Sequence, residues 1–558
     1  RDLVRSRGLG DVYKRQIVGA SVLVKGTQIG AATDIDGGFK LDVPDKATNL
    51  MVSYIGMKTQ EVKIAPDLKI YLETAIEAFD EVVVVAYGTQ KKSSITGAIS
   101  QVNSKDIETR PVSSVTSALE GASSGISVTG AVGQPGSDVS INIRGIGTVN
   151  GSNSPLIVLD GVPYDGNISD IAPEDIESIS VLKDAASCAL YGNRASNGVI
   201  LLTSKKSKVK KPTFTFKTSQ GWYERGQSDY ETVNPYQFME IEYANMFNNQ
   251  INIKGLDRTN PTDIATARDY TLKNLIEQRA VINIFDAPES SLFDENGKMA
   301  AGVRINPLFG EDLDWYDQSI KKGYRAEYNF SGAGATEYSD YYFSLNYLNE
   351  NGYTRDAGFN RLNGRAAVNI NPRPWFKAGL QVNVSHQKTN NSAGDQTGDD
   401  SSSTTNPFYF YRVIAPIYPV HLHDVNTGEY ILDADGNRQY DPGYYSHVDA
   451  DGITQEIPTR YQLQANHSIW ESEVNHDRTK RNTSNSTAYV DFILPYGFTF
   501  TMKGNLSTRN QEYTSYGSAI IGGSAKGTDG KLTKYVYNYK NWTFQQQLTW
   551  NKTYGKNY

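Results

Sequence analysis

The stretch SISVLKDAASCALYGNRASNGVILLT, residues 178–203, decides how the middle of the chain folds. Its first residues, Ser178–Leu182, predict a strand, and the apolar run Val199–Thr203 predicts a second strand. The alanine-rich residues between the two runs favour a short helix. The stretch therefore predicts a compact α/β unit.

The connections between the predicted strands and helix of this unit carry residue types that favour caps and turns. Lys183-Asp184 opens the helix, where the Asp184 carboxylate can accept from free N–H groups. The helix is expected to end at Tyr191-Gly192, and Asn197-Gly198 supplies a turn into the second strand. The single cysteine, Cys188, is expected to pack as a small apolar side chain rather than act as a nucleophile.

From Pro212 onward the pattern changes to long alternating strands. In Phe376–Ser385 every second residue is apolar, and Arg361–Ile370 alternates in a similar way. Comparable segments follow at Ala488–Leu494, Phe498–Leu506 and Trp542–Trp550. Each is roughly ten residues long, which is the length of a tilted strand that crosses a bilayer.

The connections between these segments alternate in length. Asn371–Trp375 and Pro495–Gly497 are tight turns, whereas residues 386–483 form one long loop. Short turns on one side and long loops on the other are typical of an outer-membrane barrel. A soluble array of β-sandwiches is the alternative, with shorter strands and more even loops. An α/β unit ahead of such strands suggests a plug that precedes the pore it closes.

Composition agrees with a barrel. Tyr outnumbers Phe by 36 to 19, and there are 49 Gly among 558 residues, which favours β structure with many turns. Mean hydropathy is -0.49, as expected where lipid-facing and lumen-facing residues alternate. The net charge of -7 argues against general nucleic-acid binding.

Before the strand-rich remainder at 212–558, the chain divides into four segments. Residues 1–16 are basic, lack an apolar core and are expected to be a foreign or disordered leader. Residues 17–72 predict a small β-sandwich with a hairpin turn at Asp36-Gly37-Gly38. A linker at 73–92 and the α/β unit at 93–206 follow.

Several segments, in the right order, resemble one family. They are FDEVVVVAYGTQKKSSITGAIS (79–100), RGIGT (144–148), PLIVLDGVP (155–163), IAPEDIESISVLKDAASCALYGNRASNGVILLTSKK (171–206), DLDWYDQSI (312–320) and NPFYFYRVIAPIYPV (406–420). The chain resembles the SusC/RagA family of TonB-dependent outer-membrane transporters of Bacteroidetes from residue 17 to its end. Residues 19–44 resemble the carboxypeptidase-regulatory-like domain of that family.

The resemblance implies a mainly β protein of the bacterial outer membrane, in contact with its lipid. A small carboxypeptidase-regulatory-like sandwich comes first, an α/β plug domain second, and an incomplete antiparallel barrel last. About eight strands are readable, whereas barrels of this class have 22. We therefore expect an N-terminal part of a longer transporter. Ala86 departs from the family, which usually has Gly there.

The resemblance also implies energised uptake, in which the inner-membrane protein TonB pulls on a short segment ahead of the plug. This TonB box is expected at Asp80, Glu81, Val82, Val83, Val84, Val85, Tyr87 and Gly88. A β-branched run favours extended backbone and can add as a strand to a partner's sheet edge. An ordinary edge strand of the sandwich or plug is the alternative.

Two glycine motifs of the plug also stand out. Arg144, Gly145 and Gly147 follow the predicted strand 140–143, and the glycines permit a tight turn. Arg144 is either a latch buried against carboxylates of the barrel wall or a purely structural residue. Asp160-Gly161 is expected to be a simple turn after the next strand.

Aromatic residues of the long loop suggest contacts at the outer mouth. Phe408, Tyr409, Phe410 and Tyr411 could stack on sugar rings or pack against a lid protein. The resemblance implies a SusD-like surface lipoprotein as the lid and an oligosaccharide or peptide as the ligand.

No catalytic residue, metal or cofactor is expected. His421 and His423 have metal-like spacing but no cysteine or clear carboxylate partner, and Asp433–Asn437 lacks the distal Glu of a calcium loop. No GxSxG, HExxH or P-loop occurs, which disfavours a secreted hydrolase. A non-transporting adhesin or scaffold remains the alternative, against which the plug and Val82–Val85 argue.

Overall fold

The computed structural model describes residues 3–551 apart from a number of segments. Those outside the description are 1–2, 12–18, 28, 35, 45–46, 55–58, 66, 73–81, 86–87, 92–98, 105–106, 108–113, 122–123, 130–133, 137–138, 149, 185–187, 208–210, 227–229, 392–403, 449–450, 523–528 and 552–558. The chain divides into two compact units, Arg1–Gly97 and Ala98–Tyr558.

The first unit contains the predicted β-sandwich. One sheet has the order β4-β1-β7 and the other the order β3-β2-β5-β6. Its strands are β1 (Leu3–Asp11), β2 (Ser21–Val24), β3 (Gly30–Ala32), β4 (Lys40–Asp42), β5 (Asn49–Ser53), β6 (Gln60–Lys63) and β7 (Asp67–Leu72). Val22 and Leu50 of one sheet and Leu41 and Ile70 of the other share one core, as alternation predicts.

Residues 1–16 were expected to be a foreign or disordered leader, and disorder is wrong for Leu3–Asp11. This segment is strand β1, which pairs antiparallel with β4 and parallel with β7. A β-ladder is made by backbone N–H and C=O groups, so a segment without a strong apolar pattern can still take a place in a sheet.

The segment expected to be the TonB box lies partly inside the described residues. Val82–Val85 form β8, which pairs antiparallel with β9 (Gly88–Lys91) in a separate two-stranded sheet. Asp80, Glu81 and Tyr87 lie outside the described residues. The β-branched run is extended, as its residue types favour.

The α/β domain of the second unit has a five-stranded sheet with the order β10-β15-β16-β13-β14, and a hairpin β11-β12. Its elements are β10 (Ile99–Asn103), η2 (Ser117–Leu119), β11 (Ile126–Thr129), β12 (Ser140–Ile143), β13 (Leu156–Leu159), β14 (Val162–Pro163), η3 (Ile168–Asp170), η4 (Pro173–Asp175), β15 (Ile176–Leu182), η5 (Ala189–Ala195) and β16 (Val199–Ser204). The two strands predicted from residues 178–203 pair antiparallel, with Leu182 opposite Val199.

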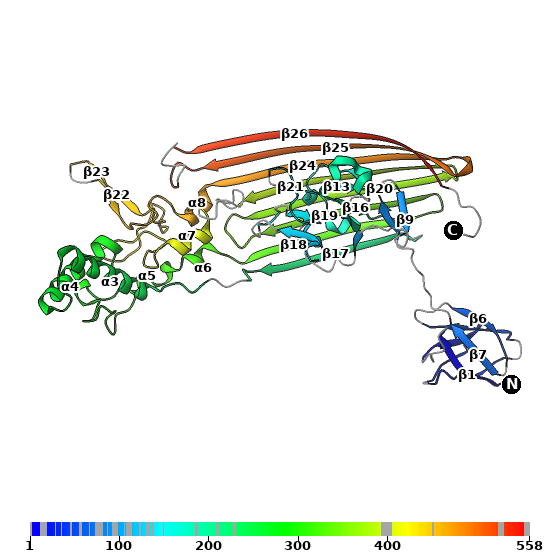
Figure 1. Ribbon diagram of the computed structural model, residues 1–558, viewed down its shortest axis with the longest axis horizontal. Helices are drawn as coiled ribbons and strands as arrows, with labels where there is room; N and C mark the ends of the chain where they lie inside the picture. The colour runs from blue at the N-terminus through cyan, green and yellow to red at the C-terminus, as the bar shows by residue number, and fades with distance from the viewer. Residues whose placement is uncertain are drawn as a thin grey trace. The chain divides into compact units, whose positions relative to one another are not determined.

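The remainder of the second unit is built on one antiparallel sheet of eight strands, in chain order from β17 to β26 (Figure 1). The strands are β17 (Thr213–Tyr223), β18 (Gly323–Ala335), β19 (Ser339–Asn351), β20 (Gly358–Arg373), β21 (Phe376–Asn391), β24 (His476–Ile493), β25 (Phe498–Gly517) and β26 (Lys531–Trp550). The predicted count of about eight strands is confirmed, although the strands are longer than ten residues.

The connections follow the predicted alternation. Short turns, such as η9 (Pro495–Gly497), join the strands at one end of the sheet, and the long connections lie at the other end. The outer-face residues of β21 are apolar from Phe376 to Val384 and become His386 and Lys388 beyond. The ten-residue segments seen in the sequence are therefore an apolar band within longer strands.

Two long connections fold into a module that the sequence analysis missed. Figure 1 shows it beyond one end of the strands. Its elements are α3 (Pro235–Lys254), α4 (Pro261–Leu275), η6 (Ile276–Ala280), η7 (Glu289–Ser291), α5 (Pro307–Gly310), η8 (Glu311–Leu313), α6 (Trp315–Ser319), α7 (Pro407–Val413), β22 (Tyr444–Val448), β23 (Thr454–Pro458) and α8 (Ser468–Val474). Met246, Trp315, Phe410 and Ile469 come from both connections and share one core.

The signal for the longest helix was present in the sequence. Asn234 caps α3 through a reciprocal pair of hydrogen bonds with Gln237, Pro235 is its first residue, and Gly255 ends it in the left-handed conformation. Among the described residues, no helix has the length and apolar character needed to cross a membrane.

Candidate functional site

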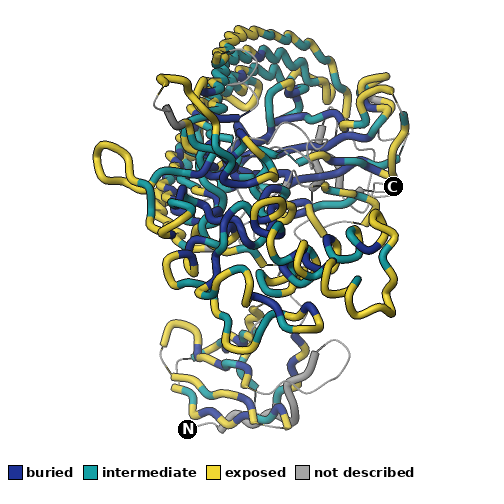
Figure 2. Tube along the Cα trace, turned by 90° about the vertical axis from the view of Figure 1, so that its left-hand side faces the viewer, coloured by how far each residue is buried: buried dark blue, intermediate teal, exposed yellow. Residues whose placement is uncertain are grey.

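The α/β domain contacts one face of the eight-stranded sheet, the inner face. Side chains on this face are polar and buried: Arg361 is 0% exposed and Asn363 is 1% exposed. Their neighbours on the outer face are apolar and exposed, with Leu362 at 44% and Leu380 at 54%. Buried residues gather in the interior of this unit (Figure 2). The sheet is thus apolar outside and polar inside, the reverse of a soluble protein and typical of a barrel in a membrane.

Backbone carbonyl groups of the α/β domain accept hydrogen bonds from this inner face. Arg361 Nη1 and Gln387 Nε2 donate to the carbonyl oxygen of Ser169 at 3.0 and 2.8 Å. Asn363 Nδ2 donates to the carbonyl oxygen of Asp170 at 2.7 Å. These donors come from two strands and converge on η3. They fix the position of that short helix against the eight-stranded sheet, which is called the wall below.

Two buried carboxylates of the α/β domain also bind the wall. Asp175 Oδ1 accepts from Tyr342 Oη at 2.9 Å and from Ser344 Oγ at 2.6 Å. Asp170 Oδ1 lies 3.3 Å from Arg481 Nη1. Asp170 and Asp175 are 1% and 2% exposed, so these contacts are shielded from water. Loss of one partner would leave the other buried and unsatisfied.

A carboxyl pair lies beside these contacts. Burial and the neighbouring carboxylate of Glu327 raise the pKa of Glu174 to about 8, and the two side chains share a hydrogen bond. Glu327 also accepts from Arg325 Nη2 at 2.7 Å and from Asn346 Nδ2 at 3.1 Å. Glu174 is therefore protonated at neutral pH and can donate to Glu327 across the contact.

The end of β16 and the following residues form a third contact. Arg365 donates to the carbonyl oxygen of Lys205 at 2.8 Å and to Ser204 Oγ. Asp160 accepts from the N–H of Ser204 at 3.0 Å, and its own carbonyl oxygen accepts from Lys503 Nζ at 3.1 Å. The predicted turn at Asp160-Gly161 is present, with φ values of 48° and 81°. Besides reversing the chain, it contacts the wall.

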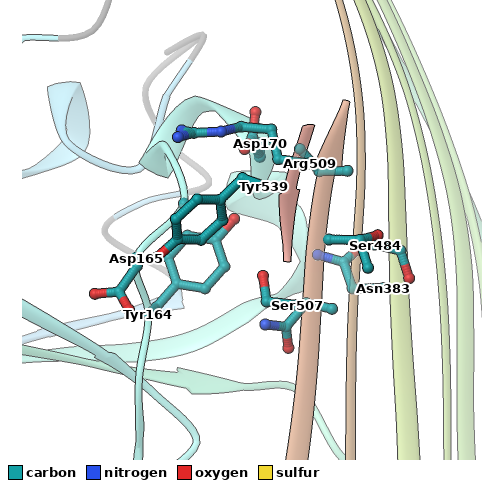
Figure 3. Close-up of a pocket in the computed structure, with 12 residues that line it drawn as sticks. Tyr164, Asp165, Asp170, Asn383, Ser484, Ser507, Arg509 and Tyr539 are labelled. Carbon is teal, nitrogen blue, oxygen red and sulfur yellow. The ribbon is translucent and has the colours of Figure 1, made fainter. Parts of the chain in front are cut away.

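A small pocket marks the far side of this contact. Figure 3 shows Tyr164, Asp165 and Asp170 of the α/β domain facing Arg509 and Tyr539 of the sheet. Arg509 Nη1 donates to Asn167 Oδ1 at 2.9 Å, and Asn541 Nδ2 donates to Asp165 Oδ2 at 2.7 Å. The contact thus extends along the inner face to the last strand of the sheet.

Nearly all of these links are hydrogen bonds or ion pairs rather than apolar packing. Hydrogen bonds contribute roughly 1 kcal/mol each in net terms, because water replaces them when they open. A polar contact of this kind can release and re-form in a hydrated lumen, whereas separating a large apolar core exposes its surface to water. The arrangement suits a domain that is held firmly but can move.

Arg144 differs from its predicted role as a latch. The residue is exposed, with φ of 61°, and its N–H donates to the carbonyl oxygen of Gly125 at 2.9 Å. The left-handed backbone of Arg144 and Gly145 turns the chain toward solvent, and the N–H of Gly147 donates to Asn153 Oδ1 at 2.9 Å. In the ion pair of the contact described above, the carboxylate is Asp170 of the α/β domain and the guanidinium is Arg481 of the wall, opposite to the latch hypothesis.

Residues of the opening stretch lie away from the wall contacts and shape the α/β domain itself. Lys183 Nζ donates to the carbonyl oxygen of Ser124 at 2.5 Å, and Asn197 Nδ2 donates to that of Ser152 at 2.8 Å. The carbonyl oxygen of Asp184 accepts from the N–H of Cys188, whereas its predicted side-chain cap stays a prediction. Gly198 has φ of 91°, and a Cβ there would lie 2.7 Å from Ile143 Cδ1.

Other predicted features of this stretch are also visible. Gly192 takes φ of 66° and interrupts η5 after Tyr191, as a helix end predicts. Cys188 is 7% exposed and packs in an apolar cluster with Leu156 and Leu201, and burial raises the pKa of its thiol. A buried thiol with a raised pKa is a poor nucleophile.

The aromatic residues proposed for the mouth divide into two groups. Phe410 is 0% exposed, and its ring centroid lies 4.9 Å from that of Trp315. The prediction that Phe410 contacts a ligand or a lid protein directly is therefore wrong. Its place in helix α7 turns it toward the module core. Phe408, Tyr409 and Tyr411 are half-buried, and Tyr411 Oη accepts from Arg225 Nη1 at 2.8 Å.

His421 and His423 do have a carboxylate partner, contrary to expectation. His421 Nδ1 lies 2.5 Å from Asp312 Oδ1 and His423 Nε2 lies 3.0 Å from Asp312 Oδ2. Asp312 begins the segment DLDWYDQSI, which is more than a hundred residues away, so sequence spacing gave no signal. Both imidazole groups contact the carboxylate of Asp312. Among the described residues, no group of three or more such side chains has the geometry for a metal ion.

Comparisons with known proteins agree with this fold. The TonB-dependent Receptor Plug Domain matches residues 91–199, and the CarboxypepD_reg-like domain matches residues 10–84. TonB-dependent receptor P3 of Formosa agariphila is 27% identical over 96% of this chain and 45% of that protein. TonB-dependent receptor SusC of Bacteroides thetaiotaomicron is 26% identical over 95% of this chain and 47% of that protein.

A solved structure of the RagAB peptide importer in the open-open state has the same fold, with a TM-score of 0.60 and 19% identity. The match covers 85% of this chain and 47% of the RagAB chain. The α/β domain, held by polar contacts on the inner face of a sheet with an apolar outer face, is the part of the chain that matches the TonB-dependent Receptor Plug Domain, and it is called the plug below.

More particularly, the chain is similar to the SusC-like TonB-dependent receptors over most of its length. It spans about half the length of the curated relatives P3 and SusC.

Proposed function

We propose that the protein imports a nutrient across the outer membrane and that movement of its plug is driven by TonB. The observation that supports this most is the set of reversible polar bonds between plug and wall, centred on Ser169, Asp170 and Asp175. A scaffold or adhesin gains nothing from a domain that is held by hydrogen bonds against the polar inner face of such a sheet. The apolar outer face of the sheet supports a position of this sheet in the membrane, with the plug on its inner side.

The energy would enter through Val82–Val85. This run is extended in β8 and pairs only with β9 among the described residues, in a sheet of two strands. A two-stranded sheet is marginally stable in water, so the run can exchange its partner for the edge of a sheet in TonB. Asp80, Glu81, Tyr87 and Gly88 would flank that docked strand.

The partners follow from the same proposal. A SusD-like surface lipoprotein would close the mouth above the module that carries Phe408, Tyr409 and Tyr411. The ligand would be an oligosaccharide or a peptide. The names of two similar proteins do not decide between these ligands. RagAB is called a peptide importer, whereas the name of SusC mentions no ligand.

The test is energised uptake by the full-length receptor with Val83→Pro, which removes a backbone donor and disrupts strand pairing. Uptake of fluorescent oligosaccharides and hexapeptides into intact cells should fall to the level of cells without TonB. Val83→Ile keeps the β-branched chain and should retain uptake, which controls for expression. Uptake by Val83→Pro at the level of the unmodified receptor would refute the proposed mechanism.

A further inference from the structure

Three exposed cations lie together on the outer face of the sheet, just beyond its apolar band. They are Lys388 of β21 and Arg478 and Lys480 of β24. Their neighbours along the two strands point inward: Gln387 is 2% exposed, and Arg481 Nη1 lies 3.3 Å from a carboxylate of the plug. Because side chains alternate along a strand, the three cations face away from the plug. Both strands have further strands on either side, so this exposure is not that of a sheet edge.

The geometry of β21 places these cations at the level of lipid headgroups. The outer face of β21 is apolar from Phe376 to Val384 and polar beyond. At a rise of about 3.4 Å per residue and a tilt of about 40°, Lys388 lies roughly 31 Å above Phe376. The apolar band of a membrane barrel is about 25 Å tall, and a headgroup layer of roughly 5–8 Å follows on each side. The ammonium group of Lys388 therefore reaches the headgroup layer.

An aromatic side chain marks the same level independently. Tyr347 of β19 is 41% exposed on the outer face and pairs with Leu362, which in turn pairs with His386. This row lies directly below that of Lys388. Tyrosine is enriched at the membrane–water interface, where its hydroxyl group meets the headgroups. Tyr347 Oη lies 3.4 Å from Asn360 Oδ1, and Asn360 is the partner of Lys388 in the register.

Two of the three cations lie directly opposite each other. Lys388 and Lys480 are partners in the register of β21 and β24. Like charges at opposed positions repel, which costs stability unless an anion lies between them. Among the residues that the structure describes, the register places one acidic side chain opposite a cation of this group, Glu512, and it forms an ion pair with Lys534 at 3.2 Å. The third cation has neutral partners on both sides, so positive charge exceeds negative charge here.

A phosphate group fits this surface, because ammonium groups bind it as point charges and a guanidinium group binds it with two parallel hydrogen bonds. Resting on the membrane position of the sheet that is proposed above, we propose that Lys388, Arg478 and Lys480 bind the anionic phosphate of a lipid headgroup in the leaflet at the mouth. The acyl chains of this lipid lie along the apolar band below, beside Leu380 and Val384. The bound lipid fixes the height of the sheet in the membrane.

Amide groups beside the cations suit the uncharged oxygen atoms of a headgroup. Asn482 Oδ1 lies 2.7 Å from His386 Nδ1, so the amide nitrogen of Asn482 can donate to ester or hydroxyl oxygens. Asn390 is the partner of Arg478 in the register and lies on the same face. Positive charge and amide donors together favour a phosphorylated lipid over a lipid without net charge.

The test is native mass spectrometry of the full-length receptor in a neutral detergent, titrated with phosphatidylglycerol and, separately, with phosphatidylcholine, which has no net charge. Phosphatidylglycerol should bind at least tenfold more tightly. Its binding should weaken at least tenfold in a variant that combines Lys388→Gln, Arg478→Gln and Lys480→Gln. Binding of phosphatidylcholine should not change in this variant.

A matched control removes the same charge from exposed positions of the module at the mouth: Lys254→Gln, Arg258→Gln and Lys273→Gln. This control should keep binding of phosphatidylglycerol within about twofold. Lys388→Gln alone gives a second readout, because it removes the repulsion and should not lower the melting temperature without lipid. Added phosphatidylglycerol should raise the melting temperature of the unmodified receptor more than that of Lys388→Gln. A merely structural lysine would lower it in both conditions.

Equal binding of the two lipids by the unmodified receptor would overturn the proposal, as would equal loss of binding in the two triple variants. Displacement of phosphatidylglycerol by the same concentration of inorganic phosphate would overturn it too, because the ligand would then be a free anion. None of these measurements needs TonB or a transported ligand. Continued uptake by Val83→Pro would therefore count against the proposed function and not against the lipid site.

Discussion

Asp312 and His423 bind each other across two connections of the chain, with 3.0 Å between Oδ2 and Nε2 and almost no solvent exposure of either side chain. His421 adds its N–H and Nδ1 to the same carboxylate. This single acidic residue therefore joins the end of one connection to the middle of the other. It holds together a module that lies beyond the strands.

Replacing Asp312 should loosen this module. Asp312→Asn leaves the buried imidazole of His423, the partly exposed imidazole of His421 and an N–H with a poorer acceptor, and each unsatisfied buried group costs roughly 1–3 kcal/mol. We expect faster cleavage of the module by trypsin and a lower melting temperature from near-ultraviolet circular dichroism, which reports Trp315. Asp435→Asn in an exposed turn is the matched control and should behave as the unmodified protein. Equal trypsin resistance of the two variants would contradict this role.

Acid should have a similar effect on the module. Burial alone would raise the pKa of Asp312, but hydrogen bonds from His421 and His423 outweigh it and hold that pKa well below its usual range. A lowered folded pKa stabilises the protein above the unfolded value of roughly 3.9, and this contribution is lost as the pH falls below it. Proteolysis below pH 4, with an acid-active protease in place of trypsin, should show faster cleavage of the module than at neutral pH.

The contact between plug and wall should respond to pH in the opposite sense. Glu174 has a pKa raised to about 8, so the folded protein holds its proton more tightly than the unfolded chain does. That contribution is present below roughly pH 4.3 and is lost as the pH rises toward 8. Hydrogen exchange at residues 168–175 should be faster at pH 8.5 than at pH 6 after correction for intrinsic rates. Glu174→Gln should remove most of this difference, and an unchanged pH dependence in that variant would rule Glu174 out as its source.

The outer face of the sheet should reject charge within the apolar band and accept it above. Leu380 lies within the band, opposite Val368 and Ala488. Leu380→Arg should reduce the free energy of folding into lipid vesicles by about 2–4 kcal/mol, the cost of arginine near the bilayer centre. His386→Arg lies on the same face of the same strand, above the band, and should change it by less than about 1 kcal/mol. A urea titration of the full-length receptor in vesicles measures both, and equal effects would argue against this placement of the band.

Local patterns predicted much of the structure because they depend on neighbours along the chain. The alternation in Phe376–Ser385 gave the strand and its two faces, since successive side chains of a strand point to opposite sides. Asp160-Gly161 predicted a turn because those two residue types are a local turn signal. The helix α3 had clear caps at Asn234 and Gly255 and was missed because the strand pattern around it was extended over the whole region.

The candidate site was only partly predictable, because its partners lie far apart in the sequence. Arg144 was expected to be either a latch against carboxylates of the wall or a purely structural residue. In the structure Arg144 is exposed, and the ion pair with the wall joins Asp170 of the plug to Arg481. Phe410 was expected at a surface and lies in a core. No local signal distinguishes a charge that meets water from one that meets another part of the chain.

The sequence alone determined the order of the parts, the type of each strand and the polar and apolar face of the sheet, because these follow from residue types at fixed short spacings. Only the tertiary structure decided that the polar face holds the plug, that Asp312 joins two connections, and that Tyr513 lies beside Tyr535. Those relationships depend on strand register and chain crossing, which bring together residues whose separation in sequence carries no periodic signal.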